Sequence, residues 1–188
     1  MKSSDFDLQT AKPLDSRFRG NDDSFVAALN EFRVDGNDVL RIADIGFEPC
    51  EELLARYGLQ LIRVDDGAPI PGTYWGEPEA GVIGCEVYAR ADTPLHSLLH
   101  ETCHLLVADP QRRAAIHTDA SDSQIEEDAA CYLQIVLADA LSGFGRERAL
   151  RDMDAWGYSF RLGSARAWFE RDAEDARAFL HARQLLTD

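Results

Sequence analysis

LHSLLHETCHLLV, residues 95–107, holds a His-Glu-x-x-His pattern within an apolar run. Thr93 is a suitable N-cap, Pro94 suits the first helical position because its missing N–H would be unpaired there anyway, and Asp109-Pro110 stops the run. These signals predict a helix over about residues 94–108. Its histidines fall in one stripe and its leucines on the other side. One face is therefore expected to pack into a core while the other lines a cleft.

The histidine stripe predicts a metal site. Side chains four residues apart stack one turn above each other, so His100 and His104 can each offer a neutral ring nitrogen to one Zn²⁺. Glu101 is placed to hydrogen-bond a water at that ion and take its proton as general base. His96 lies about 12 Å from His104 along the axis, too far to share the ion. It is expected to be a cleft-lining or second-shell side chain, or an ordinary surface histidine.

The third ligand is expected on a long helix predicted over about residues 122–141. When this helix is projected, Glu126 lies within its apolar arc, whereas Glu127 and Asp128 point towards the polar flanks. An ionised carboxylate on a buried face needs a compensating cation or metal. We therefore predict Glu126 as the third metal ligand.

A helix cap is the competing interpretation of the same glutamate. Ser123 and Glu126 fit the Ser-x-x-Glu capping box, which satisfies two backbone donors without any metal. Ser121 with Gln124 could form the box instead, which would leave Glu126 free to face the histidines. The ligand interpretation is favoured over the cap.

The composition indicates a globular protein that does not bind nucleic acid. The chain has 188 residues, of which 45% are hydrophobic and 28% charged, and this predicts a single domain over residues 23–188 behind a flexible tail, residues 1–22. A formal charge of −15 argues against affinity for phosphate backbones. No apolar run approaches a membrane span, and the N-terminus lacks the apolar middle of a signal peptide, so a cytoplasmic protein with no membrane partner is expected. The four cysteines form no Cys-x-x-Cys pair and are expected to be reduced.

The remaining pattern predicts a small sheet followed by helices, an α+β fold. Helices are predicted before the sheet at residues 24–32 and 48–57. The alternation and flanking turns predict strands at residues 59–64, 72–75 and 82–90. Helices are also expected at residues 146–156 and from Ser164 onward. The strand at 82–90 leads directly to the histidine helix, so it is expected to border the cleft and to pair with an extended substrate.

His100-Glu101-Thr102-Cys103-His104, followed after a loop by Ile125-Glu126-Glu127-Asp128-Ala129-Ala130, resembles the zinc peptidases of the ImmA/IrrE type. These are minimal gluzincins in which a glutamate on the next helix completes the site, and the similarity covers about residues 59–142. The resemblance implies a zincin-like fold, with a small sheet packed on an active-site helix and a glutamate-bearing helix and with further C-terminal helices. It also implies hydrolysis of a peptide bond in a peptide or protein substrate. Residue by residue, it implies His100, His104 and Glu126 as zinc ligands and Glu101 as general base.

Two functions of different classes follow from these residues. The first is a zinc-dependent peptidase, in which His117 or Tyr158 could donate a hydrogen bond to the tetrahedral oxyanion, although an ordinary surface or core side chain is the favoured interpretation of each. The second is a non-catalytic metal-binding regulatory protein that keeps the scaffold and recruits a basic partner through its acidic surface. The presence of Glu101 favours the peptidase, because a purely structural metal would not need it.

Overall fold

The computed structural model of the chain describes residues 38–118 and 120–186. Helices and one three-stranded sheet make up this part, which confirms the expected α+β class at that coarse level. The predicted tail over residues 1–22 and the predicted helix over residues 24–32 lie outside the described residues. None of the described helices combines the length and the apolar character needed to cross a bilayer.

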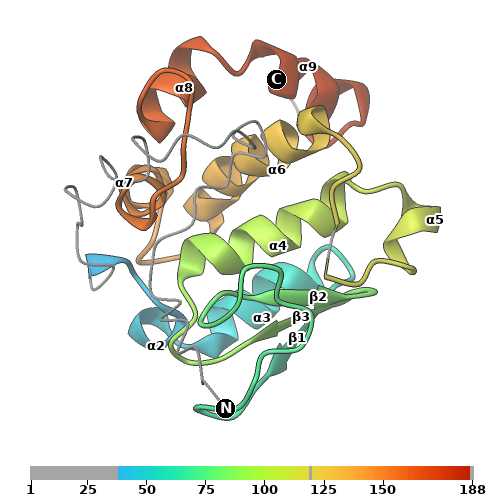
Figure 1. The fold of residues 1–188 in the computed structure, drawn as a ribbon, viewed down its shortest axis with the longest axis vertical. Helices are drawn as coiled ribbons and strands as arrows, with labels where there is room; N and C mark the ends of the chain where they lie inside the picture. The colour runs from blue at the N-terminus through green and yellow to red at the C-terminus, as the bar shows by residue number, and fades with distance from the viewer. Residues whose placement is uncertain (1–37, 119, 187–188) are drawn as a thin grey trace, which may run out of the picture.

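The elements follow one another as a short helical segment, the sheet, and a run of helices (Figure 1). Their bounds are α2 (Ile42–Ile45), α3 (Phe47–Ala55), β1 (Gln60–Arg63), β2 (Gly81–Ile83), β3 (Glu86–Ala89), α4 (Leu95–Val107), α5 (Pro110–Arg113), α6 (Gln124–Leu137), the 3-10 turn η2 (Ala138–Ala140), α7 (Arg146–Trp156), α8 (Ala165–Arg171) and α9 (Glu174–Ala182).

The sheet has the order β1-β3-β2, with β3 parallel to β1 and antiparallel to β2. The single strand predicted over residues 82–90 is wrong, because Gly84 and Cys85 form a two-residue hairpin loop between β2 and β3. Gly84 has φ 61°, and hairpin turns of this length place a residue at positive φ, which glycine adopts without a steric penalty. The alternating hydrophobic pattern ran through the turn without a break and so concealed it.

Both edges of β3 are paired, and the outer edge of β2 is covered as well. Ile83 forms an antiparallel bridge with His117, the Thr118 N–H donates to the Val82 carbonyl at 3.1 Å, and the Val82 N–H donates to the Gly72 carbonyl at 3.2 Å. The expectation that the strand at 82–90 pairs with an extended substrate is therefore wrong. Residues of the chain itself already occupy the backbone positions that a substrate would need.

The predicted strand over residues 72–75 is a loop pressed against β2. A Cβ at Gly81 would lie 2.1 Å from the Pro71 carbonyl oxygen, so only glycine allows this approach. Two polar interactions also fix the loop region. The buried Arg90 forms an ion pair with Glu77 at 2.6 Å and donates to the Ala68 carbonyl at 2.8 Å.

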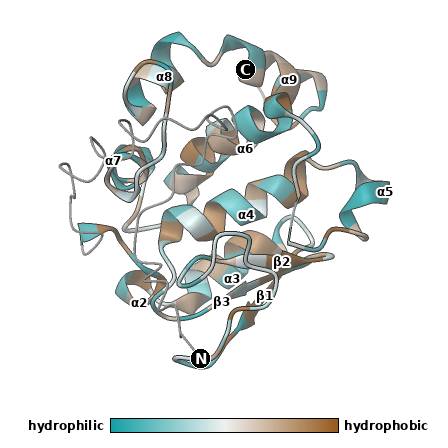
Figure 2. Ribbon diagram, viewed as in Figure 1, coloured by the Kyte–Doolittle hydropathy of each residue, from teal (hydrophilic) through white to brown (hydrophobic). Residues whose placement is uncertain are grey.

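Helix α4 lies at the centre of the molecule, between the sheet and α6 (Figure 1). All 13 of its residues are buried, including the three histidines and Glu101. Figure 2 shows hydrophilic and hydrophobic turns alternating along α4, whereas α5, which projects from the body, is uniformly hydrophilic. The helix begins at Leu95, because the Thr93 hydroxyl accepts a hydrogen bond from the Arg90 N–H and does not cap α4. The polar stripe predicted to line a cleft is instead covered by α6.

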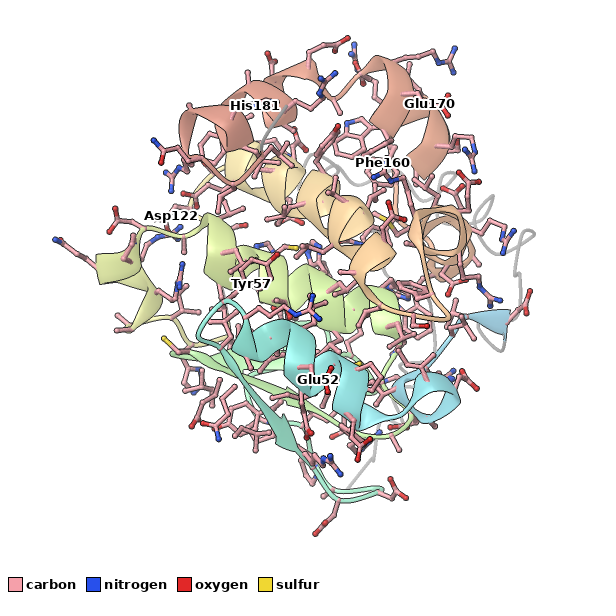
Figure 3. The ribbon with its side chains drawn as sticks, turned by 180° about the vertical axis from the view of Figure 1, so that it is seen from behind. Glu52, Tyr57, Asp122, Phe160, Glu170 and His181 are labelled. Carbon is pink, nitrogen blue, oxygen red and sulfur yellow. The ribbon has the colours of Figure 1, made fainter. Side chains whose placement is uncertain are left out.

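The helices after α4 cover its second side. α6 packs against α4, α7 and α9, and α3 packs on β1, which Figure 3 shows from behind with Glu52 on α3 and Tyr57 in the turn after it. The helix predicted over residues 122–141 is α6 followed by η2, and the predicted helix over residues 146–156 is confirmed as α7. The C-terminal helix predicted from Ser164 is two helices, α8 and α9.

The burial of α4 gives a first prediction. Leu99 is fully buried, so Leu99→Ala should lower the free energy of unfolding by about 2–5 kcal/mol through lost transfer energy and a residual cavity. Leu162→Ala deletes the same atoms at a position that is 41% exposed, and it should change stability by less than about 0.5 kcal/mol. Urea unfolding of both variants measures the difference, and equal effects would contradict the central place of α4 in the core.

Candidate metal centre

His100 and His104 face each other within the α4–α6 interface. Their Nε2 atoms are 2.9 Å apart, and their rings meet edge to face with centroids 4.3 Å apart. The i, i+4 spacing on α4 produces this pairing, because side chains one turn apart point in the same direction. The predicted convergence of these two imidazoles is present in the structure.

Hydrogen bonds on the far side of each ring fix which nitrogen carries the proton. The Ser121 hydroxyl donates its only hydrogen to Glu127 Oε2 at 3.0 Å, so its oxygen accepts from His104 Nδ1 at 3.1 Å. Gln134 presents its carbonyl oxygen to His100 Nδ1 at 2.5 Å and can only accept there. Both neutral imidazoles therefore carry hydrogen on Nδ1, and both Nε2 atoms keep a bare lone pair.

A carboxylate completes the cluster. Glu127 Oε1 lies 3.3 Å from His100 Nε2, and Glu127 Oε2 lies 3.5 Å from His104 Nε2. Glu127 Oε1 has no hydrogen-bond donor among the described residues. When both imidazoles are neutral, two nitrogen lone pairs and a carboxylate oxygen converge here with no hydrogen between them, which is unfavourable in a buried site unless a proton or a metal ion is present.

The donor set fits a zinc ion. Neutral imidazoles and a carboxylate are ordinary zinc ligands, and nitrogens bound tetrahedrally at about 2.0–2.1 Å lie roughly 3.3 Å apart. The Nε2 atoms are 2.9 Å apart, so an opening of a few tenths of an ångström would suffice. Nδ1 of each ligand histidine is held by a hydrogen-bonding partner, as is usual for metal-binding histidines.

The electrostatics of the cluster favour a positive charge beside Glu127. Burial raises the pKa of Glu127, but His104 and His100 outweigh it and lower the pKa to about 2. Burial lowers the pKa of His104 to about 4, and the neighbouring His100 contributes to the decrease. Burial opposes protonation of His100 too, yet the Glu127 carboxylate and its hydrogen bond raise the pKa of His100 well above its usual value. An ionised Glu127 therefore faces one imidazole that holds a proton readily and one that does not.

The prediction that Glu126 faces the histidines is wrong. Its carboxylate accepts from Arg112 at 2.5 Å and from the Asp122 N–H at 3.1 Å, and it lies 3.7 Å from the Arg183 guanidinium. The cation that a buried carboxylate needs is supplied here by arginines. The competing interpretation is correct in part, since Ser123 caps α6 by accepting from the Glu126 N–H, but the glutamate side chain reaches Asp122 and not Ser123.

Glu126 ties three elements together. Arg112 comes from α5 and also binds Asp122 and the Ala120 carbonyl, while Arg183 follows α9 and donates to the Val107 carbonyl at the end of α4. Figure 3 labels Asp122 at the start of α6, near α5. This arginine clamp, formed by Arg112, Glu126 and Arg183, fixes the first turn of α6 and hence the position of Glu127.

A polar row on α6 would have identified the glutamate that lies beside the histidines. Glu127, Cys131 and Gln134 have the spacing i, i+4, i+7 and therefore share one helix face. Their side chains all reach towards His100. The apolar arc used to place Glu126 lies next to this row, and neighbouring helix positions differ by about 100°.

Glu101 adjoins the cluster. A Glu101 oxygen and ring nitrogens of His100 and His104 all lie within 4.8 Å of one another. The side chain is buried. Its carboxyl group therefore lies beside both histidines, the position that a general base would need.

His96 is enclosed, and the surface interpretation is wrong. It is 1% exposed, packs against Trp156 and Tyr158 with ring centroids 5.2 and 5.5 Å away, and has no hydrogen-bond partner for either nitrogen among the described residues. Burial lowers its pKa to about 3, so the imidazole is neutral in the folded protein.

Of the two candidate oxyanion donors, Tyr158 lies near the histidines. Its ring contacts His100 edge to face at a centroid distance of 5.9 Å, and burial raises its pKa, so the hydroxyl keeps its proton. Gly157, with φ 97°, ends α7 in a Schellman motif in which the Tyr158 N–H donates to the Met153 carbonyl. His117 is exposed, and its ring contacts Thr118.

Comparison with known proteins identifies no relative. No model of a known protein family matches the chain, and searches of curated proteins and of solved structures find no significant similarity. The functional interpretation of the centre consequently depends on the contacts of His100, His104 and Glu127 themselves.

Replacing each of the two glutamates by glutamine in turn separates their roles. Glu127→Gln should weaken Zn²⁺ affinity by at least about 100-fold, more than loss of an outer hydrogen-bonding partner costs. Glu126→Gln should change Zn²⁺ affinity by less than about tenfold, because its amide oxygen can still accept from Arg112, but it should lower the free energy of unfolding by about 1–3 kcal/mol, because Arg112 and Arg183 lose the negative charge that they share. Zinc titration with a competing chelator and urea unfolding measure the two effects. The reverse pattern would restore Glu126 as the ligand.

The enclosed His96 gives a pH-dependent prediction. His96→Phe keeps the ring and removes two unpartnered nitrogens, so it should stabilise the protein at pH 7 by about 1–3 kcal/mol. Because the pKa is about 3 when folded and about 6.5 when unfolded, the unfolded parent takes up a proton first as the pH falls. The advantage of the variant should then grow by at most about 1.4 kcal/mol per pH unit below pH 6.5. Urea unfolding at pH 7 and pH 5 tests this, and a constant difference would contradict it.

Proposed function

We propose that this chain is a zinc-dependent peptidase with a zincin-like fold, in which His100, His104 and Glu127 are the metal ligands and Glu101 is the general base. The observation that carries the proposal is the convergence of the His100 and His104 Nε2 atoms with the Glu127 carboxylate. The carboxyl group of Glu101 lies beside them and is not needed as a ligand. Three protein ligands with a further position left for water are typical of catalytic zinc, whereas structural sites usually have four protein ligands.

The resemblance to the ImmA/IrrE-type peptidases supports the same assignment. In that family a glutamate on the helix after the His-Glu-x-x-His helix completes the site. Glu127 on α6 has this relation to His100 and His104 on α4, and it replaces Glu126 in the assignment. Affiliation of the chain with this family is part of the proposal.

Each protein group has a defined role in the proposed reaction. A zinc ion held by the three ligands supplies Lewis acidity and lowers the pKa of water. Glu101 accepts the proton of the attacking water and then delivers it to the leaving amine. Tyr158, whose hydroxyl stays protonated, donates to the developing oxyanion. Ser121 and Gln134 hold the two imidazoles in the tautomer that leaves Nε2 free.

The substrate is proposed to be an unstructured peptide or protein segment. The covered outer edge of β2 excludes strand addition at Val82 in the described conformation, so side-chain contacts would have to orient the substrate. With a formal charge of −15, the chain favours basic segments over acidic ones.

A non-catalytic metal-binding protein remains the alternative, favoured by the burial of the centre. His100, Glu101 and His104 are each less than 9% exposed, and catalysis would require a path for the substrate to reach them. In this alternative the metal would stabilise the α4–α6 interface, and Glu101 would have no chemical role.

Replacement of the base distinguishes the two functions. Glu101→Gln keeps the size of the side chain and removes its basicity, so hydrolysis should fall by about 10²- to 10⁴-fold. Zinc content, measured by mass spectrometry, and thermal stability should stay near those of the parent. Glu52→Gln makes the same chemical change on exposed α3 and should have no effect.

The assay requires a panel of quenched fluorescent peptides of differing charge, with a chelator-treated sample as control. Parent protein that binds one equivalent of zinc and cleaves no peptide, or a Glu101→Gln variant as active as the parent, would reject the peptidase in favour of the binding protein.

A further inference from the structure

One side chain on the α6 face that approaches His100 has no part in the proposed reaction. Cys131 lies between Glu127 and Gln134 in the polar row of α6. Both neighbours in the row contact His100: Glu127 lies beside Nε2, and Gln134 accepts from Nδ1. Cys131 therefore points into the same interface, where it is 5% exposed.

The thiol lies within reach of the metal ligands. The Cys131 Sγ, a His100 ring nitrogen and a Glu127 carboxylate oxygen all lie within 4.8 Å of one another. Ligands of a tetrahedral zinc ion with a Zn–S bond of about 2.3 Å lie roughly 3.5 Å apart, so Sγ would have to approach the His100 nitrogen and the Glu127 oxygen by at most about 1.3 Å. His, Glu and Cys are all ordinary zinc ligands.

We propose that Cys131 is a fourth protein ligand, so that in the resting protein the metal is held by His100, His104, Glu127 and Cys131. This inference rests on the proposed metal centre and refines it. On binding, the S–H bond of the thiol breaks, an Sγ–metal bond forms, the proton is released to solvent, and no electron is transferred.

Coordination by Cys131 would reconcile the two candidate functions. With four protein ligands the centre is closed and inactive, and with Cys131 displaced it has the open position that hydrolysis needs. The burial of His100, Glu101 and His104 is what a closed centre would show. Cys131 would then be a displaceable ligand at the coordination position that the water needs.

The chain provides matched controls. Cys103 is also fully buried and lies on α4, three residues after His100, but among the described residues it belongs to neither potential ligand set. Cys85 is an exposed cysteine in the β2–β3 loop and reports general reactivity of thiols.

Cobalt substitution is the direct test, because thiolate-bound Co²⁺ has a near-ultraviolet charge-transfer band that nitrogen and oxygen ligands do not produce. Metal-free full-length parent, Cys103→Ala and Cys131→Ala are titrated with Co²⁺. The parent and Cys103→Ala should bind one equivalent and show the band. Cys131→Ala should still bind one equivalent, at least about tenfold more weakly, without the band.

The outcomes separate the two proposals. Stoichiometric Co²⁺ binding by the parent without the band, or a band that persists in Cys131→Ala, overturns the thiolate ligand and leaves the three-ligand centre intact. Failure of the parent to bind Co²⁺ overturns both.

A second measurement uses the unmodified chain, in case Cys131→Ala fails to fold. Alkylation by iodoacetamide is followed at each cysteine by peptide mapping, with and without one equivalent of Zn²⁺. Zinc should slow alkylation of Cys131 at least tenfold and leave Cys85 unchanged. Equal rates at Cys131 in the two samples would overturn the proposal.

Discussion

The enclosure of two bare imidazole nitrogens between α4 and α6 is the constraint on which the rest of the structure depends. When both imidazoles are neutral, each Nε2 carries a lone pair because Ser121 and Gln134 accept the hydrogens of the Nδ1 atoms, and Glu127 adds a negative charge to the same small volume. In a buried environment this arrangement is unfavourable by itself. A proton or a metal ion at its centre would make these contacts favourable, and α6 covers the polar side chains of α4 around this volume.

Two adjacent glutamates at the start of α6 have different partners. Glu126 belongs to the arginine clamp, which connects α5, the end of α4 and the residue after α9. Glu127, rotated by about 100° on the same helix, faces the histidines. The clamp fixes the rotation of the first helical turn, so the distance from Glu127 to the imidazoles is determined by contacts made on the opposite side of that turn.

The local signals in the sequence predicted the central helix well and the long-range pairings poorly. His100, His104 and Glu101 could be placed because a single helix with clear end signals carries all three. Glu126 was chosen over Glu127 because the hydrophobic arc of α6 could be read from sequence, whereas the arginines that would satisfy Glu126 come from α5 and from beyond α9, 14 residues before it and 57 after it. The hairpin at Gly84 and Cys85 was missed for a similar reason, since alternation along residues 82–90 continues through the turn. The break between α8 and α9 also lies in a run whose apolar spacing is uninterrupted.

The covered edge of β2 bears on how the molecule behaves at high concentration. A strand whose outer N–H and C=O groups are unpaired is a template on which a second chain can add, and natural proteins protect such edges against aggregation and domain exchange. Here Gly72 and the segment around His117 occupy those groups on β2, and the approach of the Gly72 loop requires a glycine at position 81. A bulkier residue at position 81 would push this cover away, and the expected result is a protein that self-associates through its sheet while its histidine helix remains folded.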